Sequence, residues 1–111
     1  MHEALQFVRL LDGGWRDCDF EPFHPGVDIC HLLRGEPAVA LLRYRAGAKV
    51  PRHRHPGLET ILVLEGSQSD DHGRYPPGSL VLNRKGSEHR VWSEDGCVVL
   101  IQWEKPVELL E

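Results

Sequence analysis

Four residues of this chain have the types and the spacing of a metal-binding site. His53, His55 and Glu59 follow one another as H-x-H-x3-E, and His89 lies further along the chain. Side chains on a β-strand alternate between its two faces, so both histidines of the H-x-H pair can point inward, with their Cα atoms roughly 6.6 Å apart. The Pro-Gly pair that follows would bend the chain and return Glu59 to the same point. We therefore predict that the first three side chains converge on one ion, with His89 as the candidate fourth ligand.

Three imidazoles and one carboxylate form a hard-to-borderline set of ligands. Such a set suits Zn, Fe(II), Mn, Ni or Cu, and it argues against a thiolate site or an iron–sulfur cluster. We expect one divalent transition metal per chain, Zn, Fe, Mn or Ni, and the sequence does not say which. A bare H-x-H pair also occurs by chance in solvated loops, so the prediction depends on the residues around it.

Those surrounding residues resemble the two sequence motifs of the cupin superfamily. The first motif, G-x5-H-x-H-x3-E-x6-G, is matched without a gap by Gly47, His53, His55, Glu59 and Gly66. The second motif, G-x5-P-x-G-x2-H, is matched by Gly78, Gly86 and His89, while Arg84 stands at its usual Pro and Ser93 at its terminal Asn. Neither departure removes a metal ligand.

The stretch around the second motif is similar to the cupin half of ChrR-type anti-sigma factors. It contains SDDHGRYPPG, NRKGSEH and WSEDGC, where those proteins typically have SDEHG-x-YP-x-G, N-x2-G-x2-H and WSEEGC. The resemblance runs from about Trp15 to Trp103. It implies an all-β fold, a double-stranded β-helix (jelly-roll) barrel of the cupin type. It also implies a divalent metal held by His53, His55, Glu59 and His89, and a role in sensing reactive oxygen.

The length and composition of the chain are those of one compact domain. A chain of 111 residues can bury about 65% of its unfolded surface, so we expect a single cupin domain over residues 1–111, with an arm or edge element at 1–14 and the barrel at 15–105. Three cysteines without a C-x2-C pair predict a reducing compartment. The sequence shows no signal peptide and no apolar run of membrane length, so we expect a cytoplasmic protein with no membrane contact. A net charge of −4 disfavours nucleic-acid binding.

Short strands separated by turns account for most of the chain. We predict strands at 27–33, 38–45, 79–83, 89–93 and 97–105, besides the strand that carries Glu59. Residues 2–11 match neither the helical nor the strand period, so their structure is left open. The Pro- and Gly-containing region that begins at Trp15 is expected to wrap the barrel. Repeated short strands without helices favour a sandwich or barrel, and with the resemblance to cupins we choose the jelly roll.

The strand at 38–45 leaves open which of its two faces meets the cavity. Arg43 and Arg45 share one face, and Tyr44 lies on the other. An inward Arg43 could pair with Glu59 or hold an anionic ligand, whereas an outward Arg43 would be part of a solvated strand edge.

The strand that carries Glu59 is apolar on both faces, which predicts a homodimer. Leu58, Leu62 and Leu64 lie opposite the inward face, and apolar patches that need cover often mark interfaces between subunits. The alternative cover is the amino-terminal segment at 2–11.

Several other polar and aromatic residues are placed outside the metal site. His24 and His31 fall outside the ligand pattern, and His72 is expected in a polar turn. We expect Tyr75 at the rim, and Trp92 and Trp103 in the core or an interface.

Three functions are compatible with such a site, and we name no catalytic residue for any of them. The first, which we favour, is a small stand-alone cupin that senses an oxidant or binds a small molecule, related to ChrR-type oxidative-stress regulators. Those anti-sigma factors carry a separate helical zinc-binding domain, so sensing by these 111 residues would need a partner in trans.

The second function is a mononuclear metal-dependent enzyme, either a dioxygenase or a metal-assisted isomerase or hydrolase, with Glu59 as a ligand or a base. The third is a storage or structural barrel whose metal stabilises the fold. We favour sensing or binding because no complete acid–base apparatus can be identified beside the metal.

Overall fold

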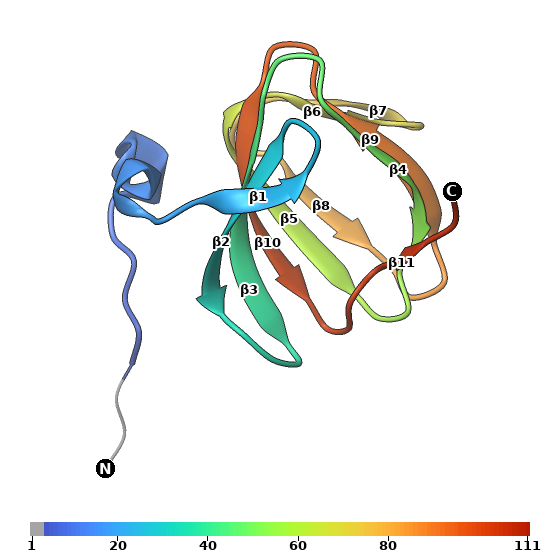
Figure 1. The fold of residues 1–111 in the computed structure, drawn as a ribbon, viewed down its shortest axis with the longest axis horizontal. Coiled ribbons are helices and arrows are strands. Elements are labelled where there is room, and N and C mark those ends of the chain that lie inside the picture. The colour runs from blue at the N-terminus through green and yellow to red at the C-terminus, as the bar shows by residue number, and fades with distance from the viewer. Residues whose placement is uncertain (1–3) are drawn as a thin grey trace.

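The computed structural model describes residues 4–111, and it consists mainly of two antiparallel β-sheets that face each other (Figure 1). The strand orders are β1-β2-β3-β10-β5-β8 in the six-stranded sheet and β11-β4-β9-β6-β7 in the five-stranded sheet. The six-stranded sheet contains β1 (Glu21–His24), β2 (Val27–Leu33), β3 (Ala38–Tyr44), β5 (Glu59–Gly66), β8 (Leu80–Asn83) and β10 (Cys97–Trp103). The five-stranded sheet contains β4 (Lys49–Arg54), β6 (Gln68–Asp70), β7 (Gly73–Tyr75), β9 (Glu88–Trp92) and β11 (Glu108–Leu109). The predicted all-β jelly-roll fold is confirmed.

The main hydrophobic core lies between the two sheets. It joins alternate residues of the larger sheet, such as Leu42, Val63 and Val99, to Val50 and Val91 of the smaller sheet. All five side chains are at most 7% exposed. Because residues at every second position are buried, the sheets are locked face to face, and polar residues on the same strand faces must lie in the same interior.

The register of β3 settles which of its faces points inward. Tyr44 is buried in the core between the sheets, and Arg43 lies on the outer face. There Arg43 Nη2 lies 3.1 Å from Asp28 Oδ2, and the guanidinium lies 4.2 Å from the centre of the Phe20 ring. Arg43 therefore does not point inward toward Glu59.

The outer face of the six-stranded sheet is partly covered by the chain's own amino-terminal region. Two short 3-10 helices, η1 (Leu10–Asp12) and η2 (Gly14–Asp17), bring Trp15 onto a second apolar cluster that includes Leu41, Leu64 and Val98. Leu64 is only 5% exposed, so it needs no second protomer to cover it. Leu10 of the segment at 2–11 proposed as the alternative packs against this cluster, and residues 2 and 3 of that segment lie outside the described residues.

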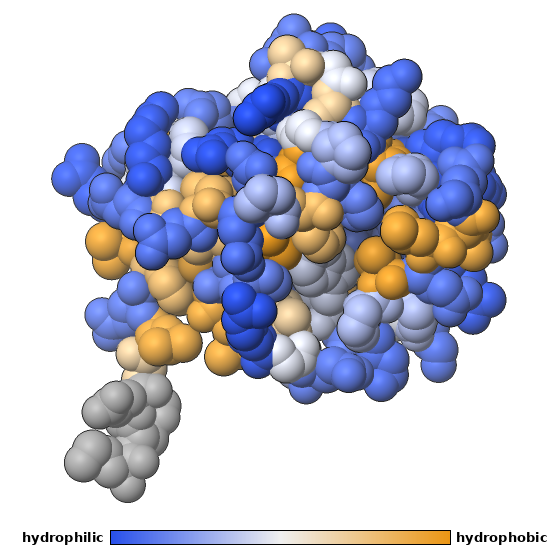
Figure 2. Space-filling view, in the orientation of Figure 1, coloured by the Kyte–Doolittle hydropathy of each residue, from blue (hydrophilic) through white to orange (hydrophobic). Residues whose placement is uncertain are grey.

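The described residues before η1 form an irregular arm that reaches away from the sheets (Figure 1). Leu5, Phe7 and Val8 of this arm and Leu11 of η1 are exposed, and Figure 2 shows apolar surface on this side of the molecule. No helix in residues 4–111 is long and apolar enough to cross a membrane.

A glycine at the end of β5 fixes how this strand aligns with β10. Gly66 has a positive φ of 73°, and a Cβ atom there would collide with the carbonyl oxygen of Gly96. Only glycine tolerates both conditions, so Gly66 can stay opposite Cys97. The same ladder places Glu59, at the other end of β5, opposite Trp103.

The last strand, β11, lies beyond the barrel limit expected at residue 105. It pairs with β4, with Leu109 opposite His53. The carboxyl-terminal residues therefore cover the edge of the strand that carries the H-x-H pair.

Candidate metal centre

The four residues predicted as metal ligands come together between the two sheets. His53 of β4 is the cross-strand partner of His89 of β9, and His55 directly follows β4. Glu59 opens β5 and approaches from the facing sheet. One ligand atom from each residue lies within 4.8 Å of those of the others, and all four side chains are buried. The fold therefore builds one compact cluster from three strands and a turn.

The three imidazole rings surround a common point. The ring centres of His53 and His89 are 4.6 Å apart, those of His55 and His89 are 4.7 Å apart, and those of His53 and His55 are 5.0 Å apart. The rings are nearly perpendicular to one another, with interplanar angles of 70° to 88°. This arrangement suits convergence on an ion rather than stacking.

Each ring is held through its Nδ1 atom, which leaves Nε2 facing the cluster. His53 Nδ1 lies 2.8 Å from the carbonyl oxygen of Pro51, and His55 Nδ1 lies 3.0 Å from both the carbonyl and the hydroxyl oxygen of Ser87. A carbonyl oxygen can only accept a hydrogen bond, so Nδ1 carries the proton and Nε2 of a neutral ring has a free lone pair. This is the tautomer that binds a metal through Nε2.

Two of the three Nε2 atoms have no hydrogen-bond partner among the described residues. Those of His55 and His89 are buried and make no hydrogen bond. His55 Nε2 lies 3.1 Å from Glu59 Oε1, and His89 Nε2 lies 4.0 Å from the same oxygen. Lone pairs of nitrogen and oxygen that face each other at such distances repel unless a positive charge lies between them. A proton or a metal cation can supply that charge, so the residues fit a bound metal.

Glu59 is held as an ionised carboxylate. Asn83 Nδ2 donates to its Oε1 at 2.9 Å, and Trp103 Nε1 donates to its Oε2 at 2.7 Å. Burial raises the pKa of Glu59, but contact with His55 and the hydrogen bond from Trp103 outweigh burial and lower the pKa below its ordinary value. Both carboxylate oxygens are therefore fixed in place.

A second buried carboxylate, Asp70, stands behind the cluster. Its Oδ2 lies 3.2 Å from His89 Nδ1. Burial raises the pKa of Asp70, but hydrogen bonds from the His72 amide, the Tyr75 hydroxyl and His89 more than offset it and lower the pKa. Within residues 4–111, no Lys or Arg pairs with Asp70 or Glu59. Two buried carboxylates without a Lys or Arg partner favour a cation bound in the cluster.

The sequence prediction did not include Asp70, Asn83, Trp103 or Ser87. None of them belongs to the H-x-H-x3-E pattern, and Trp103 was expected only as a core or interface aromatic. A signal was present, however, because Asp70 and Asn83 stand in the SDDHG and N-x2-G-x2-H segments that carry the resemblance to ChrR-type proteins.

The remaining residues considered in the sequence lie outside the cluster. His72 is exposed in the turn between β6 and β7, and His31 lies 3.4 Å from Glu21 on the outside. Trp92 donates its indole N–H to Glu94. His24 lies at the mouth of the barrel, where its ring centre is 4.6 Å from that of Phe23.

The cavity beside the cluster is very small. It has a volume of about 20 Å³, and His53, Glu59, Tyr44 and Gln68 are among the residues that line it. A single water needs roughly 10–15 Å³. A larger apolar pocket of about 320 Å³ lies at the mouth of the barrel and shares four wall residues with the cavity, namely Phe23, His24, Trp103 and Val107.

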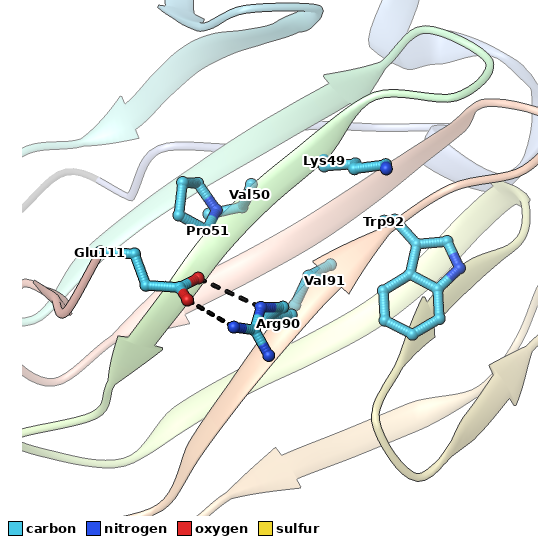
Figure 3. Close-up of a pocket in the computed structure, with 7 residues that line it drawn as sticks. All are labelled: Lys49, Val50, Pro51, Arg90, Val91, Trp92 and Glu111. Atoms are coloured by element: carbon cyan, nitrogen blue, oxygen red, sulfur yellow. Dashed lines mark hydrogen bonds and ion pairs between the residues drawn. The ribbon is translucent and has the colours of Figure 1, made fainter.

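A third pocket lies along β4 and β9 and contains none of the four clustered residues. Its volume is about 590 Å³, and Lys49, Arg90, Trp92 and Glu111 are among its walls. Figure 3 shows the Glu111 carboxylate paired with the Arg90 guanidinium across this pocket. This pocket of about 590 Å³ therefore lies apart from the clustered histidines.

Acid should destabilise the metal-free protein through two of these histidines. Burial lowers the pKa of His53 and of His89 below the ordinary value. The unfolded chain takes up protons on both rings near about pH 6.5, whereas the folded chain keeps them neutral to lower pH. The unfolded state then binds more protons, so the free energy of unfolding falls as the pH drops below about 6.5.

Denaturant titrations of metal-free protein at about pH 7.5 and about pH 5.5 measure this loss. A His89→Gln variant should show a smaller difference between the two pH values, while a variant of the exposed residue, His72→Gln, should match the wild type. Equal stability of the wild type at both pH values would contradict the prediction.

Comparison with known proteins agrees with the fold and the motifs. The family described as ChrR Cupin-like domain matches residues 14–106. The anti-sigma-E factor ChrR of Cereibacter sphaeroides is 35% identical over 102 residues, and the match covers 89% of this chain and 46% of that protein. The chain thus spans about half the length of this relative.

Two solved structures show how widely the architecture is shared. The complex of Rhodobacter sphaeroides SigE with the anti-sigma factor ChrR matches with a TM-score of 0.73 and 31% identity, over 78% of this chain and 50% of that one. An acetylacetone dioxygenase from Acinetobacter johnsonii matches with a TM-score of 0.80 over 100% of this chain and 81% of that one. Its identity of 16% supports similarity of fold alone. The family match over most of the chain, the identity to ChrR and the two facing sheets lead to one conclusion: this chain belongs to the ChrR cupin-like domain family.

Proposed function

We propose that this chain is a metal-binding module that senses a small oxidant, with His53, His55, Glu59 and His89 as the metal ligands. Support for the ligand set comes from the Nε2 atoms that converge without partners and from the buried carboxylates that lack a basic neighbour. A bound divalent transition metal would supply a Lewis-acidic or redox-active centre. The chain's own contribution is to hold the three imidazoles in one tautomer and to keep Glu59 ionised.

The size of the cavity is the observation that favours sensing over catalysis. Pockets for drug-sized ligands typically measure about 300–1,000 Å³. The cavity beside His53 and Glu59 measures about 20 Å³, which admits a species of the size of water, dioxygen or peroxide. An organic substrate would require the wall residues at the mouth to move. The metal centre would therefore be accessible mainly to small oxidants.

The second candidate function is a mononuclear metal enzyme, either a dioxygenase or an isomerase or hydrolase. The mouth pocket of about 320 Å³ favours it, because this pocket is large enough for a small organic molecule and shares Trp103 with the metal site. Against it, both oxygens of Glu59 are held by hydrogen bonds, so this carboxylate is not free to act as a base. No other carboxylate was found among the residues that line the small cavity.

The ligand set can be tested by substitution. Protein purified without an affinity tag should contain about one metal per chain, and His53→Ala and His89→Ala should each lose most of it, because each removes one of four ligands. His72→Ala is the matched control, because this histidine is exposed in a turn. Metal analysis by mass spectrometry gives the stoichiometry. Retention of a full equivalent in His89→Ala would remove that residue from the proposed set.

The two functions can be separated by counting reaction events. Metal-loaded protein is exposed to peroxide or singlet oxygen, and separately to dioxygen with a panel of dicarbonyl and phenolic compounds. A sensor should give one stoichiometric event per chain, seen as metal release or a change in near-ultraviolet circular dichroism. Repeated turnover of any organic compound would instead establish the enzyme and refute the sensing proposal.

We also propose a homodimer, formed through a different part of the sheet than the sequence suggested. On the outer face of the six-stranded sheet, Leu80 and Leu82 of edge strand β8 are 61% and 57% exposed. They continue a half-buried apolar row, in which Leu62 lies between Leu80 and Leu100. A second copy placed there would cover this row.

Light scattering at micromolar concentration tests the dimer. We expect a dimeric wild type and a monomeric Leu80→Asp/Leu82→Asp variant, because two charges would be buried without partners. Leu11→Asp, which changes a residue that is 69% exposed elsewhere, should remain dimeric. A monomeric wild type would refute the proposal.

Signal output would require another protein. ChrR has been solved in complex with SigE, and a corresponding partner in trans is part of the sensing proposal for this chain. A cytoplasmic location is also proposed, because three cysteines without a C-x2-C pair indicate a reducing compartment.

A further inference from the structure

One of the three histidines is held differently from the other two. The Nδ1 atoms of His53 and His55 contact oxygens of Pro51, which lies within β4, and of Ser87, which directly precedes β9. His89 instead leans on the side chain of Asp70, with Nδ1 and Oδ2 3.2 Å apart. A carboxylate behind an imidazole fixes the ring orientation and makes Nε2 a stronger electron donor. Of the three histidines, His89 is therefore the one that a carboxylate from another strand supports.

Asp70 is itself fixed by its own hairpin. Its Oδ1 accepts hydrogen bonds from the His72 amide and from the Tyr75 hydroxyl, both at 2.8 Å. Asp70 is 7% exposed and lies between Gly73 of β7 and Val91 of β9 in the sheet. All three groups on Asp70 thus come from the hairpin at 68–75 or from His89. The SDDHGRYPPG segment, which carries part of the family resemblance, thus holds Asp70 in place against His89.

The hairpin at 68–75 is joined to the barrel by a short ladder and by side-chain contacts, among them those of Asp71 with Arg52 and of Tyr75 with the main core. In the sheet, β6 pairs with β9 only at two positions, Ser69 opposite Trp92 and Asp70 opposite Val91. At its base, Ser69 donates to Glu94, and Arg74 forms an ion pair with Asp95. The contact between Asp70 and His89 is one of several attachments of the hairpin, and it is the one that ends on a predicted metal ligand.

We propose that Asp70 is a positioning residue for His89 and that, through it, the hairpin at 68–75 follows the state of the metal centre. The inference rests on the proposed metal site. Binding equilibria are reciprocal, so any factor by which the Asp70 contact raises metal affinity is the factor by which bound metal stabilises that contact. The hairpin is exposed at Asp71 and His72, so a change at the metal would reach the molecular surface there.

The substitution Asp70→Asn tests this inference. It keeps the size of the side chain but removes its charge, and an amide N–H facing His89 would favour the tautomer that cannot bind metal through Nε2. We expect metal affinity, measured by competition with a chelator, to fall about 10–100-fold, as is usual for such supporting carboxylates. Asp71→Asn is the matched control, because Asp71 lies on the same hairpin and contacts Arg52 instead of a histidine.

Hydrogen exchange provides a readout that a merely structural role would not move. The His72 amide is bonded to Asp70, so its exchange reports how often the hairpin opens. In the wild type, metal should slow this exchange by the same factor that Asp70→Asn costs in affinity. In Asp70→Asn, metal should change the exchange little.

Tyr75→Phe keeps the inference testable if Asp70→Asn does not fold. It removes one of the two donors to Asp70 Oδ1, and a smaller loss of affinity is expected. Wild-type affinity in folded Asp70→Asn, or metal-independent exchange of His72 in the wild type, would overturn the inference while leaving the metal site intact. A wild type that binds no metal would instead refute the proposed function itself.

Discussion

The structure depends on one electrostatic constraint, the burial of a carboxylate among three imidazoles between two sheets. Glu59 is 3% exposed, and His55 Nε2 is within 3.1 Å of it. An ionised carboxylate in a protein interior is costly unless an opposite charge or hydrogen bonds compensate it. Asn83 and Trp103 provide the hydrogen bonds, and the remaining requirement is positive charge. The uncompensated negative charge of Glu59 therefore destabilises the cluster when no cation is present and favours the binding of a cation.

The barrel meets this constraint by bringing together strands that are distant in the sequence. The pairing of β4 with β9 sets His53 opposite His89, while the alignment of β5 with β10 sets Glu59 opposite Trp103. A shift of one residue in either ladder would turn a ligand toward the outer face. Such shifts are opposed by Gly66 at one end of β5 and by the two apolar clusters, which lie on the inner and outer faces of the six-stranded sheet. The metal site is therefore a property of the whole fold and not of the H-x-H segment alone.

The parts of this arrangement differ in how far the sequence could predict them. His53, His55 and Glu59 form one local pattern, so strand alternation was enough to bring them together. Grouping His89 with them required the resemblance to a family, because its pairing with β4 is a long-range contact that no local period encodes. The alternation of β3 gave two equal choices, and packing of Tyr44 in the core decided between them.

The residues that sequence reasoning missed all act through other residues. Asp70, Asn83 and Trp103 hold a ligand without being one, so their residue types carry no spacing signature of their own. The region that begins at Trp15 was expected to wrap the barrel, but the sequence did not indicate which residues it would cover, because an irregular segment has no period to detect.

The residues that hold the ligands in place also determine how a change at the metal could reach other parts of the protein. His53 and His55 are held by oxygens of Pro51 within β4 and of Ser87 just before β9. His89 is held by a hairpin that joins the sheet at only two positions. His89 itself lies on β9 opposite His53, so what distinguishes it from the other two histidines is the Asp70 side chain behind its ring. A structural change at the metal would therefore be passed to the hairpin through the contact between His89 and Asp70.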